Sequence, residues 1–304
     1  MVKLLIVDDD ISFSNQLKHA LEQKHYQCFV TNTPELVIDT IKKEDISVVL
    51  LDVMMPRRSG FELCRQIRID RDVYNTGIIF LSAMNDPEEL EHGFSQGGDD
   101  YLVKPVSLSL LISRINTLIS SIKNTPLLDA YTGLGTVRFL RLELQRTILL
   151  YQTSGFVYVE LSGLPSLQSI LSGTDTLKII NTFARHIKTI ATAYFGKDYQ
   201  LGHIGNGHFM VLIPPKDLWV FLKDLKKSWE DLLPEIYSNY GLSMEALKNK
   251  KESLLTLCLC GLLSHPNAST SAKSVFDSLK QLYMQSKLQP NNEILIDRRS
   301  SHSK

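Results

Sequence analysis

Lys3-Leu4-Leu5-Ile6-Val7-Asp8-Asp9 is the stretch that decides the fold of the first part of this chain. An uninterrupted apolar run such as Leu4 to Val7 is typical of a strand that is covered on both faces, as in a parallel sheet. Similar runs occupy residues 47–51, 77–81 and 100–103. Apolar residues at helical spacing fill the intervals, at about residues 12–24, 34–43, 61–69, 87–96 and 107–123. The alternation predicts an open, doubly wound α/β domain of the (βα)5 type.

Polar side chains follow the predicted strands at the points where the strands end. They are Asp8, Asp9, Asp52, Ser82 and Lys104. Ligand sites in open parallel sheets lie just beyond the carboxyl ends of the strands, so we expect these side chains to converge. Clustered carboxylates repel one another, and a divalent cation relieves that repulsion. Oxygen ligands with no histidine or cysteine nearby favour Mg²⁺.

The expected pocket suits phosphoryl chemistry. Asp52 can act as a nucleophile toward a phosphoryl group and form an aspartyl phosphate. Lys104 and the metal would offset the charge of the transferred group, and Ser82 would hydrogen-bond one of its oxygens. The alternative interpretation is an acidic cluster that serves only solubility, or a pocket of this kind that no longer accepts phosphate.

Four motifs closely resemble the receiver domain of two-component response regulators over about residues 1–123. They are Val7-Asp8-Asp9, Leu51-Asp52-Val53-Met54-Met55-Pro56, Leu81-Ser82-Ala83 and Gly98-Asp99-Asp100-Tyr101-Leu102-Val103-Lys104-Pro105. The resemblance implies a flavodoxin-like, or CheY-like, fold and a histidine kinase or phosphotransfer protein as the partner that phosphorylates Asp52.

The same resemblance implies a role for each residue of the pocket. Asp9, Asp52 and the backbone carbonyl of Met54 would ligate Mg²⁺ directly, and Asp8 would act mainly through water. Ser82 and Tyr101 match the switch pair of the family, in which the hydroxyl moves toward the phosphate and the aromatic ring turns inward.

The chain as a whole has the composition of an ordinary globular protein, and its 304 residues predict about two domains. Its formal net charge is zero, which gives no sign of nucleic-acid binding. No signal peptide and no apolar stretch of membrane-spanning length is visible, so we expect a cytoplasmic protein that binds no membrane. The four cysteines lack metal-site spacing, and we expect reduced thiols.

A turn at Asn124-Thr125-Pro126 predicts the domain boundary. We expect a receiver domain over residues 1–123, a linker over 124–128, a second α/β domain over 129–298 and a polar tail over 299–304. The helices of the second domain are expected at about 136–152, 175–194, 218–232 and 272–287. Its strands are expected at 155–161, 199–204, 208–213 and 254–263. Gly205-Asn206-Gly207 between two of the strands predicts a tight hairpin, hence a mixed or antiparallel sheet.

The second domain resembles the GGDEF domain of diguanylate cyclases, which have a nucleotidyl-cyclase-like fold. Asp129-Ala130-Tyr131-Thr132-Gly133-Leu134 resembles the D-x-L-T-G-L motif of the family, with Tyr131 in place of leucine. Near the end of the chain, residues 281–291 resemble a second family motif, A-L-Y-x-A-K-x-x-G-R-N.

The reactive positions of the family are substituted in this chain. Gly205-Asn206-Gly207-His208-Phe209 stands where the family has G-G-D-E-F, so both carboxylates are replaced. Of the upstream motif D-x-D-x-F-K-x-x-N, one carboxylate remains as Glu160, while Pro165 and Gln168 replace the lysine and asparagine. Joining two GTP molecules needs metal ions held by carboxylates. His203 and His208 flank the hairpin, where exposed histidines are the simpler interpretation and metal binding is the alternative.

The sequence therefore favours a response regulator that is not an enzyme. A degenerate GGDEF-like domain would pass on its signal through a downstream protein partner, a homodimer or a bound nucleotide. The alternative is an active diguanylate cyclase that makes cyclic di-GMP from GTP with a divergent site. A DNA-binding transcription factor is a weaker candidate, because no helix-turn-helix with a basic recognition helix follows residue 124.

Overall fold

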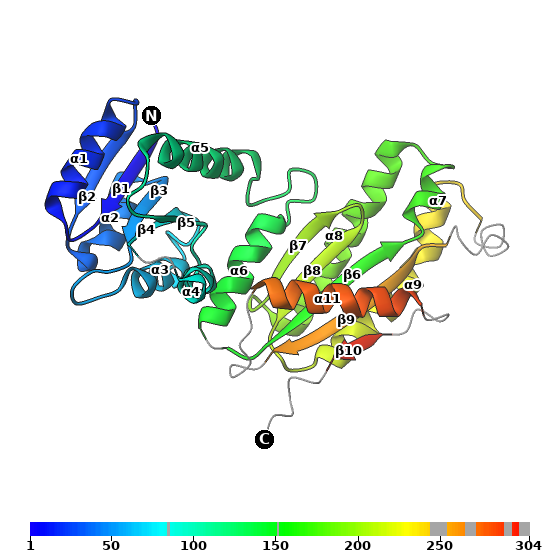
Figure 1. Ribbon diagram of the computed structural model, residues 1–304. Helices are drawn as coiled ribbons and strands as arrows, with labels where there is room; N and C mark the ends of the chain where they lie inside the picture. The colour runs from blue at the N-terminus through cyan, green and yellow to red at the C-terminus, as the bar shows by residue number, and fades with distance from the viewer. Residues whose placement is uncertain (84–85, 151, 244–253, 265–271, 289–293, 298–304) are drawn as a thin grey trace, which may run out of the picture. The chain divides into compact units, whose positions relative to one another are not determined.

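The computed structural model describes residues 1–83, 86–150, 152–243, 254–264, 272–288 and 294–297 (Figure 1). The predicted tail at 299–304 and residues 289–291 of the last GGDEF-like motif lie outside these ranges. The chain divides into two compact units, Met1–Thr125 and Pro126–Lys304. Each is described by itself, as unit 1 and unit 2. No helix in the described ranges combines the length and the apolar character needed to cross a membrane.

Unit 1 is built on a five-stranded parallel sheet in the order β2-β1-β3-β4-β5. The strands are β1 (Lys3–Val7), β2 (Gln27–Thr31), β3 (Val48–Asp52), β4 (Gly77–Ser82) and β5 (Asp100–Val103). The helices are α1 (Ile11–Glu22), α2 (Val37–Glu44), α3 (Gly60–Ile69), α4 (Pro87–Gln96) and α5 (Leu108–Asn124), and a short 3₁₀ turn, Pro34–Leu36, precedes α2. This arrangement confirms the predicted flavodoxin-like fold.

Successive residues of each buried strand point to opposite faces of the sheet, which explains the uninterrupted apolar runs. On β3, Val49 and Leu51 pack with α2 and α3, whereas Val48 and Leu50 pack with α1 and α5. All four side chains are fully buried. Each contributes about 1.5–3 kcal/mol through removal of apolar surface from water. The strand ends are thereby held in fixed register.

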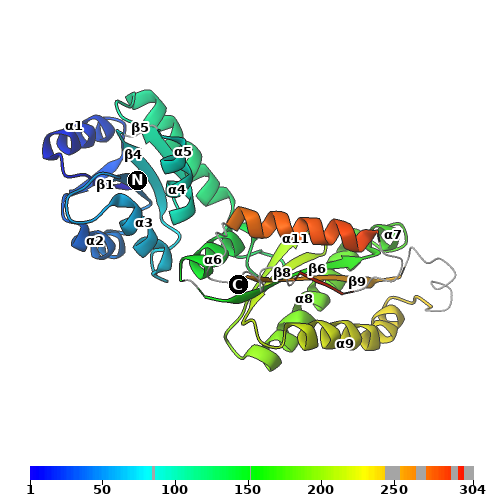
Figure 2. The same ribbon diagram turned by 60° about the horizontal axis from the view of Figure 1, so that its bottom comes forward.

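Unit 2 contains a five-stranded mixed sheet in the order β10-β9-β6-β8-β7. Its strands are β6 (Ser154–Ser162), β7 (Gln200–Gly205), β8 (His208–Ile213), β9 (Thr256–Ser264) and β10 (Leu295–Asp297). Only the β10–β9 pair of these strands is parallel. The helices are α6 (Val137–Leu149), α7 (Leu164–Gln168), α8 (Gly173–Phe195), α9 (Leu218–Asn239) and α11 (Ala272–Lys287). Helices α8 and α9 cover one face, while α6 and α11 cover the other (Figure 2).

Helix α9 extends seven residues beyond the predicted end at Leu232, through Pro234 to Asn239. A proline inside a helix removes a backbone hydrogen bond and costs about 3 kcal/mol. Burial of Ile236 and Tyr237 against the core of unit 2 offsets this cost. The Tyr237 hydroxyl also accepts a hydrogen bond from the backbone N–H of Leu255 at 2.7 Å. Tertiary packing therefore overrides the local preference of the sequence.

An opening turn, residues 129–135, lies along the outer edge of β7. The backbone N–H of Gly135 donates to the carbonyl of Leu201 at 3.1 Å, and the N–H of His203 donates to the carbonyl of Gly135 at 2.8 Å. A Cβ atom on Gly202 would lie 2.8 Å from the carbonyl oxygen of Gly135, so the close approach requires glycine there. The opening turn thus covers part of the edge strand.

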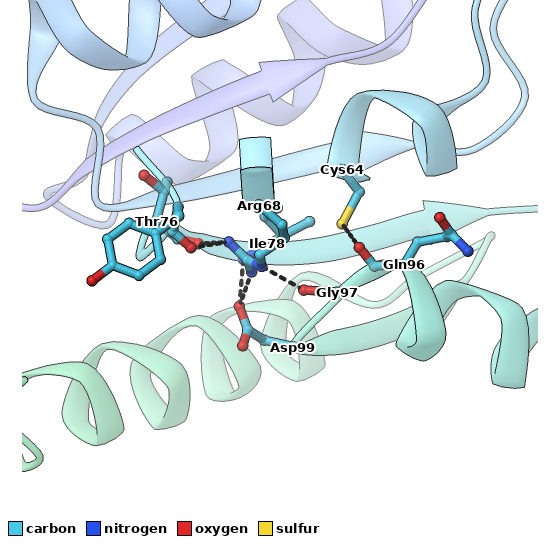
Figure 3. A network of polar contacts seen from close by, with 8 residues as sticks. Cys64, Arg68, Thr76, Ile78, Gln96, Gly97 and Asp99 are labelled. Carbon is cyan, nitrogen blue, oxygen red and sulfur yellow. Dashed lines mark hydrogen bonds and ion pairs between the residues drawn. The ribbon is translucent and has the colours of Figure 1, made fainter. Parts of the chain in front are cut away.

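A buried arginine near the end of α3 connects this helix to the segments that come before β4 and β5. Arg68 is 1% exposed, and its guanidinium donates to the carbonyls of Gly97, Tyr74 and Thr76 at 2.7–2.9 Å (Figure 3). It also forms an ion pair with Asp99 Oδ2 at 2.8 Å, an oxygen that accepts from the N–H of Ile78 as well. A buried cation without such partners would cost several kcal/mol. The network fixes α3, β4 and the end of α4 to one another.

Replacement of Arg68 by alanine should destabilise unit 1 by about 3 kcal/mol or more, because the change leaves buried carbonyls and a carboxylate without their partner. Amide hydrogen exchange in β1 and β3 measures the free energy of unfolding of this unit. The exposed Arg71, changed to alanine, serves as the control and should alter it by less than about 0.5 kcal/mol. Equal effects of the two changes would contradict the role given to the network.

Candidate functional site

The polar residues predicted at the strand ends meet at the carboxyl edge of the parallel sheet of unit 1. Asp52 and Ser82 are the last residues of β3 and β4, while Asp8 and Asp9 follow β1 and Lys104 follows β5. Strand β1 lies between β2 and β3, so the chain order reverses beside it, where open sheets bind ligands. Carboxylate oxygens of Asp8, Asp9 and Asp52 lie within 4.8 Å of one another.

Lys104 is the cation that holds the buried part of this acidic cluster. Its Nζ lies 2.7 Å from Asp8 Oδ2 and 2.7 Å from Asp52 Oδ1. Asp8 and Asp52 are buried, whereas Asp9 is exposed. The Lys104 backbone N–H donates to the carbonyl of Ser82 at 2.6 Å, which fixes the lysine relative to β4. The ammonium also lies over the ring of Phe13, 4.6 Å from its centroid.

Burial and the neighbouring charges shift the acidity of both partners. Burial raises the pKa of the Asp52 carboxyl, Lys104 opposes this shift, and the charges of Asp8 and Asp9 add to it. Burial alone would lower the pKa of Lys104, but its contacts with Asp52 and Asp8 outweigh burial and raise it. Lys104 is therefore stabilised in its protonated form, and its pairing with Asp52 opposes the rise that burial causes in the Asp52 pKa.

The donor set fits a divalent cation. Three carboxylates against one ammonium leave a surplus of two negative charges (three minus one), and the ligand atoms are all oxygen. Receiver domains commonly hold Mg²⁺ at an acidic site of this kind, and Mg²⁺ prefers oxygen ligands. Among the described residues, this is the one group of at least three histidine, cysteine or acidic side chains that is placed to hold a metal ion.

Ser82 and Tyr101 are neighbours on adjacent strands. Ser82 is fully buried, Tyr101 is 7% exposed, and a hydrogen bond joins their side chains. Burial raises the pKa of the Tyr101 hydroxyl, while the Ser82 hydrogen bond acts in the opposite direction. The Tyr101 ring thus lies inward and is linked to the end of β4.

Two residues beside the site, Gly60 and Phe13, were given no role on the basis of the sequence. A Cβ atom on Gly60 would lie 2.0 Å from the carbonyl oxygen of Asp52, so only glycine allows α3 to begin this close to the strand end. The Gly60 N–H donates to the carbonyl of Val53 at 2.9 Å. Phe13, which contacts Lys104, gave no signal because an aromatic residue on a helix is ordinarily part of the core. The side chain of Met54 is 60% exposed beside this site.

The predicted cyclase-like positions of unit 2 contain few acidic groups. Gly205, Asn206 and Gly207 all have positive φ (110°, 49° and 78°), as a tight hairpin requires. Glu160 lies on β6 directly opposite His208 on β8. Pro165 and Gln168 both lie on α7.

His203 and His208, which flank the hairpin, are partly buried, which differs from the exposed hairpin histidines we expected. His203 is nine-tenths buried, with its Nδ1 3.6 Å from Asp129 Oδ1, and burial lowers its pKa. The hydroxyl of Tyr158 lies 2.9 Å from His208 Nδ1. Cys258 and Cys260 are free and buried on β9, as are Cys28 and Cys64 in unit 1.

Comparison with known proteins identifies unit 1. Residues 4–116 match the family profile of the response regulator receiver domain. The nisin biosynthesis regulatory protein NisR of Lactococcus lactis subsp. lactis is 38% identical over 117 residues, which cover 38% of this chain and 50% of that protein. The heme response regulator HssR of Staphylococcus aureus (strain MRSA252) is 31% identical over 119 residues, covering 39% of this chain and 52% of that protein. The chain spans about half the length of the curated relatives it matches.

Solved structures of receiver domains also match the chain. The BeF3-activated DrrB receiver domain is 33% identical, covers 40% of this chain and 98% of its own, and has a TM-score of 0.36. The receiver domain of the Francisella response regulator 1452 is 32% identical, covers 41% of this chain and 100% of its own, and has a TM-score of 0.38.

Asp52→Asn tests the cost of an ionised carboxylate in the buried pocket. Because the pKa of Asp52 is raised, first by burial, the folded state holds this proton more tightly than the unfolded state. Stability from this group is therefore fully present below the usual carboxyl pKa and falls as pH rises through the raised one. In metal-free buffer, Asp52→Asn should raise the free energy of unfolding of unit 1 near neutral pH, and the gain should vanish in acid.

The free energy of unfolding of unit 1 is measured near neutral pH from amide hydrogen exchange in β1 and β3. In acid it is measured from urea-induced unfolding of the same unit. Asp45→Asn is the control, because Asp45 is exposed and has a left-handed backbone (φ 53°) that asparagine tolerates equally well. It should leave the free energy of unfolding unchanged at both pH values. A loss of stability in Asp52→Asn near neutral pH would show that the pairing with Lys104 exceeds the cost of burial.

Proposed function

We propose that this chain, whose residues 4–116 form a response regulator receiver domain, is a response regulator that a histidine kinase phosphorylates on Asp52. Unit 2 is its output, a GGDEF-like domain without cyclase activity. It acts through protein contacts, dimerisation or a bound nucleotide. Magnesium is the expected metal of the receiver pocket.

The observation that carries the proposal is the placement of Asp52 against Lys104 and within 4.8 Å of the other two carboxylates. A carboxylate oxygen of Asp52 attacks phosphorus, the bond to the donor nitrogen or oxygen breaks, and the leaving group departs with that electron pair. Lys104, 2.7 Å from Asp52 Oδ1, is near enough to pair with an oxygen of the phosphoryl group once it is attached. A bound Mg²⁺ would supply further positive charge for the phosphate oxygens.

The link from phosphate to output is proposed to run through Ser82 and Tyr101. Ser82 is buried at the end of β4, one strand from Asp52, and its hydroxyl is shared with Tyr101. A phosphoryl group on Asp52 would compete for the Ser82 hydroxyl as a stronger, charged acceptor. The Tyr101 side chain then loses or changes a partner, which alters the surface of β5.

The absence of cyclase activity is supported by the chemistry of unit 2. A reaction that joins two triphosphates needs divalent ions held by several carboxylates. Glu160 is one carboxylate, its cross-strand neighbours are His208 and Cys258, and its charge is already paired with Lys287. The competing function, a cyclase with a divergent site, rests on this one remaining glutamate.

Phosphorylation is tested with a small phosphoryl donor, acetyl phosphate, in the presence of Mg²⁺. The intact mass of the chain should rise by one phosphoryl group, and Asp52→Asn should abolish the rise because the nucleophile is gone. Asp10→Asn is the matched control. Asp10 caps α1 by accepting from the Phe13 N–H, a role that asparagine fills equally well. A phosphoryl group found on Asp52→Asn would contradict the proposal. So would a wild-type chain that gains no phosphoryl group either from acetyl phosphate or from a cognate kinase.

Cyclase activity is tested separately by incubation of the phosphorylated chain with GTP and Mg²⁺. We expect no cyclic di-GMP, because the carboxylates that would hold the metal ions are replaced. A known active cyclase in the same assay sets the detection limit. Formation of cyclic di-GMP that is lost on Glu160→Gln would establish the competing function.

A further inference from the structure

One polar row crosses the face of the unit 2 sheet that α11 covers. By strand register, Glu160 on β6 lies between His208 on β8 and Cys258 on β9. Apolar side chains fill much of the rest of this face, with the buried Phe156, Met210 and Leu262 among them. The Glu160 side chain is 13% exposed. An ionised carboxylate at such a position costs several kcal/mol unless a cation is paired with it.

Lys287, the last residue of α11, supplies that cation. Its Nζ lies 2.5 Å from Glu160 Oε2 and donates to Ser162 Oγ at 3.2 Å. The same ammonium lies 5.4 Å from the ring centroid of Tyr283. The Glu160 charge is thus balanced one for one, in contrast to the pocket of unit 1, where three carboxylates face one ammonium.

The last turn of α11 is packed against the sheet, which keeps the backbone of Lys287 close to Glu160. Ser286 Oγ lies 2.8 Å from Cys258 Sγ on β9. Tyr283 packs on Tyr158, with 5.1 Å between ring centroids, and Leu282 is buried in the same cluster. The helix end is therefore anchored at the polar row and beside it, and a tethered ammonium has a high effective concentration at Glu160.

We propose that Lys287 is a built-in counter-cation that occupies the position against Glu160 where a divalent metal ion would have to bind. A free Mg²⁺ or Mn²⁺ would have to displace a tethered charge and gain only one carboxylate in return. Such ions bind well only where several oxygen ligands are available. The inference rests on the proposed function and deepens it, because it gives a reason why unit 2 takes up no metal–nucleotide substrate. The contacts of Lys287 themselves do not depend on what the output of the chain is.

The test uses Mn²⁺ as a paramagnetic probe of the full chain. A Mn²⁺ ion at Glu160 would broaden the ring-proton NMR signal of the neighbouring His208, which is assigned by its loss in His208→Gln. In the wild type we expect millimolar Mn²⁺ to broaden signals around Asp52 and to leave the His208 signal intact. In Lys287→Met, which keeps the length of the side chain and removes its charge, the His208 signal should broaden more than in the wild type, because even a weakly held, rapidly exchanging Mn²⁺ ion relaxes protons beside the carboxylate.

Two further variants make the result decisive. Glu160→Gln combined with Lys287→Met should restore the His208 signal, because the carboxylate ligand is gone. Lys287→Gln repeats the test with a polar side chain should the methionine variant disturb α11, as judged from the amide spectrum of unit 2. The proposal is overturned if the wild type shows the same broadening at His208, or if neither folded Lys287 variant shows any.

Failure of this inference and failure of the proposed function remain distinguishable. Broadening at His208 in the wild type without cyclic di-GMP would remove the inference and leave the inactive output standing. Cyclic di-GMP from the wild type without broadening at His208 would overturn the proposed function while Lys287 still excluded Mn²⁺ from Glu160.

Discussion

The charge balance around Asp52 is the constraint on which the rest of unit 1 depends. Two buried carboxylates share a single ammonium, so each one is left with unpaired negative charge in a region largely withdrawn from water. Such an arrangement persists only where the surrounding structure keeps the groups from separating. The parallel strands provide this restraint, because their ends are set by fully buried side chains on both faces. The Arg68 network adds a second restraint on the side of α3 and α4.

The two units handle buried acidic groups in opposite ways. Unit 1 keeps an excess of negative charge beside Lys104 and so retains an attraction for a metal cation. Unit 2 has one glutamate and one lysine in the polar row on the face of its own sheet, and the pair has no net charge. A pair without net charge attracts a charged ligand less than an acidic cluster does. The excess of negative charge that favours a metal ion therefore lies in unit 1.

Much of this arrangement could be predicted from local patterns. The apolar runs located β1, β3, β4 and β5 to within a residue or so, and Gly205-Asn206-Gly207 located the hairpin of unit 2. The convergence of Asp8, Asp52 and Lys104 followed from the general geometry of parallel sheets. The flavodoxin-like fold and the receiver domain are both confirmed. These predictions succeed because the pattern and the structure depend on the same few neighbouring residues.

Other features depend on contacts between distant residues and gave no local signal. Strand β10 has three residues and is formed by pairing with β9 alone, while α7 follows a glycine with positive φ at residue 163. Lys287 and Glu160 are 127 positions apart (287 minus 160), so neither predicts the other. Arg68 could have been flagged, because a charged residue on the buried side of α3 demands partners. The identity of those partners, three backbone carbonyls and Asp99, could not be read from side-chain types.

The opening turn of unit 2 has a consequence for self-association. Strand β7 is an edge strand, and exposed edge strands pair readily with the edges of other chains. Here Gly135 already occupies backbone groups of Leu201 and His203, and the opposite edge, β10, is only three residues long. Both edges of the described sheet are therefore poor templates for strand addition. If unit 2 assembles with a copy of itself, the contact is expected between helices. A helix surface presents side chains and no unpaired strand backbone, so such a contact does not lead to open-ended β-aggregation.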